Sequence, residues 1–112
     1  MAAVKASDKL TLRDRLSRLT FEQACKLLGP QGRKLIPLGA MWDYQLQEDV
    51  FLGDDLFRLR LPRPDGSEPF AVTITLSAEA RDRLHWQCDH CREACEHVGA
   101  AFSLILEEKT AL

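Results

Sequence analysis

Residues 84–108 read LHWQCDHCREACEHVGAAFSLILEE, and this stretch decides how the chain is expected to fold. It begins with an alternation of apolar and polar residues, which is typical of a half-buried strand ending at Cys88. It ends with helix-forming, largely apolar residues from about Glu96 to Glu108. The stretch therefore predicts a strand and a helix joined by a short segment rich in cysteine and histidine.

The joining segment contains five residues of the types that bind metal ions. Structural zinc sites take four Cys thiolates or His nitrogens at tetrahedral corners, and the spacing of Cys88 and Cys91 lets one tight turn bring both sulfurs to one ion. Cys95 and His97 can reach the same ion only if Cys95 precedes the helix and His97 lies in its first turn. The sequence predicts one structural Zn²⁺ bound by these four residues.

His90 leaves the second ligand open, because it could replace Cys91. Four protein ligands leave no coordination position for water or substrate, so we expect a structural zinc in a chain that is not an enzyme. A thiol redox enzyme is disfavoured because the Cys88 and Cys91 pair does not open a helix after a βαβ strand. Cys25 lies on an apolar helix face, and we expect it to be a buried thiol.

Upstream of this stretch the first third of the chain is expected to be helical. Apolar residues recur at helical spacing over residues 11–19. Thr20 followed by Gln23 is a capping-box signature for a second helix, and a helical turn over residues 31–36 is expected to end at Pro37.

The middle of the chain changes to the two-residue period of strands. Alternation over residues 42–46 predicts a strand, and residues 50–52 predict a short one. Residues 56–77 predict a β-hairpin with turn chemistry at residues 64–67. The predicted class is α+β: short N-terminal helices, a small antiparallel sheet, and a ββα zinc finger that ends in the C-terminal helix.

The expected organisation is a disordered tail over residues 1–8, a helical segment over 9–38, and the sheet with its finger over 39–112. A chain of 112 residues with 46% apolar composition can form one hydrophobic core. No window approaches the roughly 18–20 consecutive apolar residues of a membrane span, and no signal peptide is visible, so we expect a cytoplasmic protein without membrane contact.

The formal charge of −2 hides an asymmetry along the chain. Residues 1–34 carry eight Lys or Arg against three acids, and residues 35–57 carry five acids and no base. The candidate phosphate-facing residues are Arg13, Arg15, Arg18, Lys26, Arg33 and Lys34. The acidic set is Asp43, Glu48, Asp49, Asp54 and Asp55. A pI near 5.9 argues against a domain whose main work is to grip nucleic acid.

Strands that lead into a cysteine pair, then Cys-x-His and an apolar helix resemble the SWIM zinc finger, whose usual pattern is Cys-x-Cys, a variable spacer and Cys-x-His. The best match is CEHVGAAFSL at residues 95–104. The N-terminal helices and GDDLFR at residues 53–58 resemble the amino-terminal regions of bacterial Swi/Snf-type helicase-like ATPases that carry such a finger. This chain departs from the pattern in its Cys-x-x-Cys pair and its three-residue spacer before Cys95.

The resemblance implies a compact zinc module that contacts DNA or protein beside a larger ATPase motor, and that this chain is a piece of such a protein. The first expectation is therefore DNA contact through the basic residues. The second is a protein-protein or intramolecular docking module, with no nucleic-acid binding, whose acidic set faces a basic partner, for instance the ATPase domain of the same protein. Neither expectation involves a small-molecule substrate.

Overall fold

The structure is a computed structural model that describes residues 12–53, 55–76 and 84–108. The predicted tail over residues 1–8 lies outside this part of the chain, as does Asp54 of the acidic set. The helices and strands of the described residues are α2 (Leu12–Ser17), α3 (Phe21–Leu28), α4 (Gly32–Gly39), α5 (Leu46–Asp49), β1 (Val50–Leu52), β2 (Phe57–Leu61), β3 (Phe70–Leu76), β4 (Leu84–Cys88) and α6 (Glu96–Glu108).

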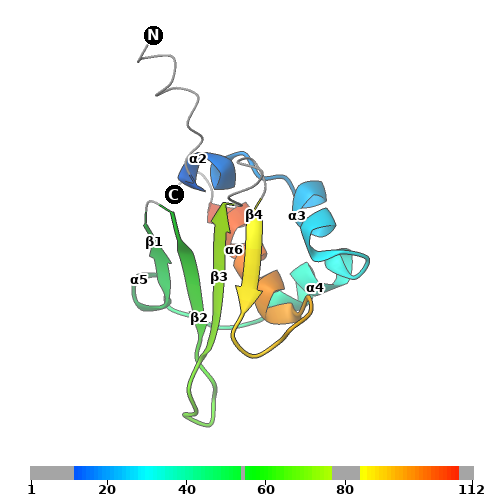
Figure 1. Cartoon of the computed structure of the whole chain (residues 1–112). Coiled ribbons are helices and arrows are strands. Elements are labelled where there is room, and N and C mark those ends of the chain that lie inside the picture. Colours follow the sequence, from blue (N-terminus) through cyan, green and yellow to red (C-terminus); the bar gives the residue numbers. More distant parts are fainter. Residues whose placement is uncertain (1–11, 54, 77–83, 109–112) are drawn as a thin grey trace.

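The four strands form one antiparallel sheet in the order β1-β2-β3-β4. Leu61 pairs with Phe70 at the loop end of the β2–β3 hairpin, and Val72 pairs with Cys88 at the end of β4. Helix α6 packs against β2, β3 and β4, and α3 and α4 pack against α6 on the side away from β1 (Figure 1). The predicted α+β class is confirmed. Among the described residues, no helix has the length and apolar character needed to cross a membrane.

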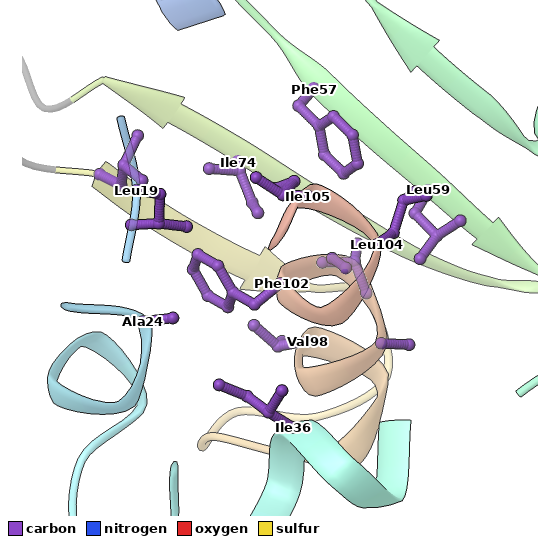
Figure 2. Close-up of a cluster of buried hydrophobic side chains, with 14 of the residues drawn as sticks. Leu19, Ala24, Ile36, Phe57, Leu59, Ile74, Val98, Phe102, Leu104 and Ile105 are labelled. Atoms are coloured by element: carbon purple, nitrogen blue, oxygen red, sulfur yellow. The ribbon is translucent and has the colours of Figure 1, made fainter. Parts of the chain in front are cut away.

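The core lies between the sheet and α6. In β2, Phe57 and Leu59 are fully buried while the alternate residues are exposed, as a sheet with one covered face requires. Figure 2 shows Phe102 and Ile105 of α6 reaching toward Phe57 and Ile74 of the two central strands. Burying each such side chain stabilises the fold by about 1.5–3 kcal/mol, so this layer fixes the position of α6.

Helices α4 and α6 approach each other backbone to backbone, at two glycines. A Cβ atom on Gly99 would overlap the carbonyl group of Leu35, and a Cβ atom on Gly39 would overlap the backbone of Ala100. No side chain fits at either position, so both residues must be glycine for the first turn of α6 to lie this close to α4.

The predicted helical turn over residues 31–36 was too short, because α4 runs to Gly39 with Pro37 inside it. Proline lacks the N–H that would bond one turn back, but the Ala40 N–H donates to the Ile36 carbonyl at 3.0 Å, so the helical pattern resumes after it. Packing against α6 outweighs the single missing bond.

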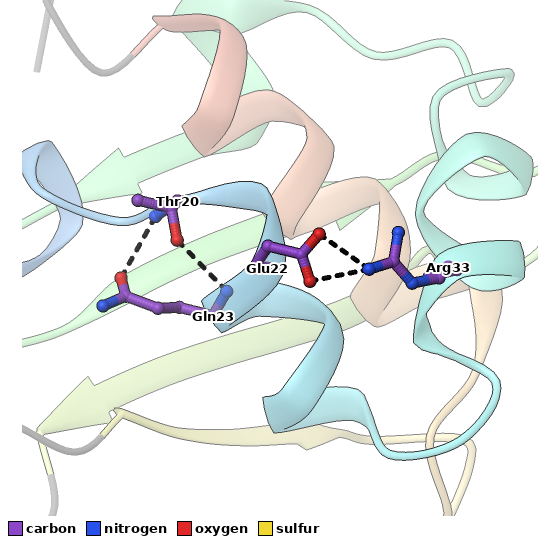
Figure 3. A network of polar contacts seen from close by, with 4 residues as sticks. All are labelled: Thr20, Glu22, Gln23 and Arg33. Atoms are coloured by element: carbon purple, nitrogen blue, oxygen red, sulfur yellow. Dashed lines mark hydrogen bonds and ion pairs between the residues drawn. The ribbon is translucent and has the colours of Figure 1, made fainter.

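Helix α3 begins at the predicted capping box, which Figure 3 shows. The Gln23 N–H donates to Thr20 Oγ1 at 3.2 Å, and the Thr20 N–H donates to Gln23 Oε1 at 3.1 Å. The exposed ion pair of Glu22 with Arg33, at 2.6 Å, joins α3 to α4. Cys25 on the inner face of α3 is buried, as predicted.

The strand predicted over residues 42–46 is absent, which corrects the sequence analysis. Residues 42–45 form no regular element, and α5 begins at Leu46. Trp42 and Tyr44 are half-buried and their neighbours exposed, so the alternation does report burial. The Gln45 N–H, however, donates to the Asp49 carboxylate at 2.7 Å and not to a neighbouring strand. The period therefore reports burial at Trp42 and Tyr44 but not at Leu46, which is exposed, and its interpretation as a β-strand was wrong.

Candidate metal centre

The junction between β4 and α6 gathers four candidate ligands. Cys88 is the last residue of β4, Cys91 lies in the turn that follows, Cys95 directly precedes α6, and His97 lies in its first turn. One ligand atom from each residue, three sulfurs and a ring nitrogen, lies within 4.8 Å of all the others. Cys88 and His97 are buried, and the other two residues are half-buried. This group could hold a metal ion.

The three distances from the His97 ring nitrogen to the cysteine sulfurs match those of a tetrahedral zinc site. His97 Nδ1 lies 3.7 Å from the sulfur of Cys88, 3.7 Å from that of Cys91 and 3.6 Å from that of Cys95. Bonds of about 2.3 Å to sulfur and about 2.0–2.1 Å to nitrogen, at tetrahedral angles, separate the two atoms by about 3.5–3.6 Å. A zinc-sized ion therefore fits between the nitrogen and each of the sulfurs.

Cys95 is also the N-cap residue of α6. Its carbonyl accepts the first helical bond, from the Gly99 N–H at 3.1 Å, and its sulfur accepts from the N–H groups of Val98 and His97. These donors favour a thiolate, but burial has the larger effect and raises the pKa of Cys95 to about 12. Without metal this thiol is therefore protonated at neutral pH, and a metal ion would have to displace its proton.

Burial also controls the charge of two other members of the group. It is the main cause that raises the pKa of the Cys91 thiol above its ordinary value, and the main cause that lowers the pKa of His97. A lowered pKa keeps the His97 imidazole neutral at pH 7. A neutral ring nitrogen has the lone pair that a metal ion needs.

Aromatic rings surround His97, and the sequence analysis did not identify them. The Phe70 ring stacks on the imidazole with centroids 3.9 Å apart and an interplanar angle of 23°. The Trp42 ring meets the imidazole edge-on at 5.1 Å, and Trp42 Nε1 donates to Glu96 Oε1 at 3.2 Å. The only local signal was the half-buried alternation that includes Trp42, and it did not indicate what this side chain contacts.

His90, the alternative second ligand, lies outside the group of four. It is exposed, and its ring lies edge-on to Phe70 with centroids 4.9 Å apart. Between the two candidates, the geometry favours Cys91.

A hollow of about 420 Å³ runs along β4 and the turn after it, lined by residues 85–92. Cys88 and Cys91 are among the residues that line it, so the hollow reaches the group of four. A binding site for an ion needs such an entry path.

The predicted basic residues are spread over α2, the turn after it, α3 and α4, and they do not join the group of four. Arg33 is engaged by Glu22 and also lies over the Phe21 ring at 5.8 Å, and Arg15 donates to Gln23 Oε1 at 3.5 Å. The residues of the basic set that are exposed are Arg13, Arg18, Lys26, Arg33 and Lys34.

The predicted acidic set is not a uniform surface. The Asp49 carboxylate is turned inward with its residue only 7% exposed, accepts from the Gln45 N–H, and lies 3.6 Å from Arg60. Asp43, Glu48 and Asp55 are exposed. Asp49 is therefore engaged by groups of its own chain.

The candidate metal centre thus consists of a Cys₃His group at a strand-to-helix junction, enclosed on the His97 side by aromatic rings. Three cysteine sulfurs and one imidazole are a ligand set of the kind that binds zinc in structural sites. Comparison of the chain with models of known protein families, with curated proteins and with solved structures finds no match.

Proposed function

We propose that the chain is a zinc-binding module in which Cys88, Cys91, Cys95 and His97 hold one structural Zn²⁺. The observation that carries this proposal is the set of three distances, 3.6–3.7 Å, between His97 Nδ1 and the cysteine sulfurs. With four protein ligands the ion has no position for water or substrate, so its role is structural and not catalytic.

The ion would join the end of β4 to the first turn of α6. Binding requires the thiolates, which do not meet in an unfolded chain, so the free energy of metal binding becomes free energy of folding. The residues between Cys88 and Cys95 form no helix or strand of their own. The zinc would therefore hold the irregular connection between β4 and α6 in a single conformation.

A pair of variants tests the ligand set. Cys91→Ser removes a proposed ligand, and we expect it to bind zinc at least about tenfold more weakly, because a hydroxyl does not replace a thiolate in such a site. His90→Gln is the matched control one residue away, and we expect it to keep one zinc per chain with unchanged affinity. Zinc binding that survives Cys91→Ser but not His90→Gln would contradict the proposed set.

We further propose that this module is SWIM-like and contacts DNA as part of a helicase-like ATPase. The resemblance of residues 95–104 and 53–58 supports this role, as do the exposed basic side chains of α2, α3 and α4. Affinity for random duplex DNA should then fall steeply with salt, because each phosphate contact releases a counterion. Loss of binding in the double variant Arg13→Gln/Arg18→Gln, with Arg58→Gln as a control on the sheet, would support contact through the N-terminal helices.

A protein or intramolecular docking role is the second candidate, and a different observation favours it. Large apolar side chains are exposed around the end of α4 and the start of α5, with Leu38 41%, Met41 80% and Leu46 51% exposed. Exposed apolar residues of this kind mark protein contacts when they gather in one patch. The absence of DNA binding even near roughly 50 mM salt would favour this role over the first.

A further inference from the structure

The candidate metal centre stands at the end of a column of stacked side chains that begins in the β2–β3 loop. The Phe70 ring, at the start of β3, stacks on His97 at 3.9 Å. The guanidinium carbon of Arg63, in the loop, lies 4.0 Å from the centroid of the same ring. Since His97 covers one face of Phe70, Arg63 covers the other. The order of the column is Arg63, Phe70, His97.

The other contacts of the column leave the imidazole little freedom. The Trp42 ring meets both rings edge-on, and its centroid lies 5.6 Å from that of Phe70 and 5.1 Å from that of His97. Its Nε1–H donates a hydrogen bond to Glu96 Oε1. His97 is only 8% exposed. The plane of the imidazole, and hence the direction of Nδ1, is therefore set by Phe70 and Trp42.

Arg63 occupies a place that hydrogen bonding does not explain. Its Nε atom is buried and has no hydrogen-bond partner among the described residues. Leaving such a donor unsatisfied is unfavourable, so the position must be favoured by something else. The contact with the face of Phe70 is one such interaction, since a guanidinium over an aromatic ring is attracted by the ring quadrupole.

Charge supplies the second interaction. A Zn²⁺ ion with three thiolates and a neutral imidazole carries a formal charge of −1, and a half-buried anionic centre is stabilised by a nearby cation. We propose that Arg63 is a positioning residue of the metal centre: through Phe70 it fixes the His97 ring for ligation, and its cation offsets the charge of the loaded site. This inference rests on the proposed zinc function.

The test compares two arginines that each lie over a phenylalanine. Arg63→Met removes the charge and the planar face from the column, and Arg58→Met does the same for Arg58, which lies 5.5 Å from the Phe51 ring centroid. Both proteins would be titrated for zinc against a chromogenic chelator. We expect Arg63→Met to bind zinc about 10-fold to 100-fold more weakly, as when other supporting residues of metal ligands are lost, and Arg58→Met to match the wild type.

Two further measurements separate the roles of Arg63. Arg63→Lys keeps the charge but loses the planar face, so affinity near the wild type assigns the effect to charge, and affinity near that of Arg63→Met assigns it to stacking. The visible absorption of the cobalt-substituted chain reports ligand geometry, and we expect Phe70→Leu to shift it.

The outcomes distinguish the inference from the function beneath it. Wild-type zinc affinity in both Arg63→Met and Arg63→Lys, with an unshifted cobalt spectrum in Phe70→Leu, would overturn the inference and leave the zinc module standing. A wild-type chain that binds no zinc would overturn both.

Discussion

At the scale of single residues, Cys95 has two roles that can be separated by substitution. It caps α6 through its sulfur and is a proposed metal ligand. Serine is a good N-cap residue but a poor zinc ligand, so Cys95→Ser should lose zinc while the metal-free protein keeps its stability. Cys95→Ala should lose zinc and also destabilise the metal-free protein by about 0.5–2 kcal/mol. Chelator titration and urea unfolding of both variants measure the two effects, and equal metal-free stabilities would contradict the capping role.

The titratable residues of the same group predict how the metal-free fold responds to pH. His97 has a pKa lowered from 6.5, so below that pH the unfolded chain takes up a proton that the folded chain resists, and stability falls as pH falls through the folded value. Cys95 has a pKa raised from 9.0 to about 12, so its contribution is present below pH 9.0 and is lost as pH rises toward about 12.

Urea unfolding in the presence of a chelator, from about pH 5 to about pH 11, would check this dependence. We expect a maximum of stability between the two limits, with the alkaline loss reduced in Cys95→Ser and the acid loss reduced in His97→Gln. A flat profile would contradict the burial of these groups. Zinc binding itself should strengthen as pH rises through the neutral range, because the ion displaces thiol protons.

At the scale of elements, the contact between α4 and α6 predicts an unusual sign for one substitution. Replacing a glycine inside a helix by alanine usually stabilises the fold by about 0.5–1 kcal/mol. At Gly99 the added Cβ would overlap the Leu35 carbonyl, so Gly99→Ala should instead destabilise the protein, by about 1–3 kcal/mol as for other overpacked sites. Urea unfolding measures the sign, and a stabilised variant would show that the helices do not meet this closely.

The elements that local patterns specify were predicted well. The helix over 96–108 and the strands of the hairpin have strong periodicity and clear end signals, and the structure confirms them. The strand predicted over residues 42–46 was wrong because alternating apolar residues do not reveal whether a partner strand is present. Helix α4 was predicted too short because Pro37 is a local stop signal, whereas the contact with α6 that carries the helix past it is long-range.

At the scale of the whole molecule, the sequence was enough to predict the four candidate ligands but not the side chains that surround them. The ligands fall within ten residues, and their types and spacing indicate a metal. Trp42 and Glu96 are 54 residues apart, and their hydrogen bond depends on how the first half of the chain passes beneath α6. Nothing in the local sequence marks Trp42 as a neighbour of His97, or Arg63 as a neighbour of Phe70.

The hydrophobic core holds α6 against the sheet along most of its length, and the candidate metal ligands lie at its first turn. Residues 97–105 of α6 are all buried, so packing alone orients the helix on the sheet. A metal ion bound by the Cys₃His group would act at the first turn of α6, where the chain arrives through residues 89–95 without regular structure. Removing the metal should therefore loosen the junction and the environment of Trp86, whose Nε1 donates to the Leu27 carbonyl at 2.9 Å, more than it alters secondary structure.

The proposed zinc module holds one zinc ion in the Cys₃His group. Native mass spectrometry of the zinc-reconstituted chain, with and without a strong chelator, tests it most directly. We expect a mass greater by one zinc and smaller by the displaced thiol protons. With chelator this gain should disappear and the near-ultraviolet signal of Trp86 should collapse. A chain whose mass and near-ultraviolet spectrum are the same with and without chelator would contradict it.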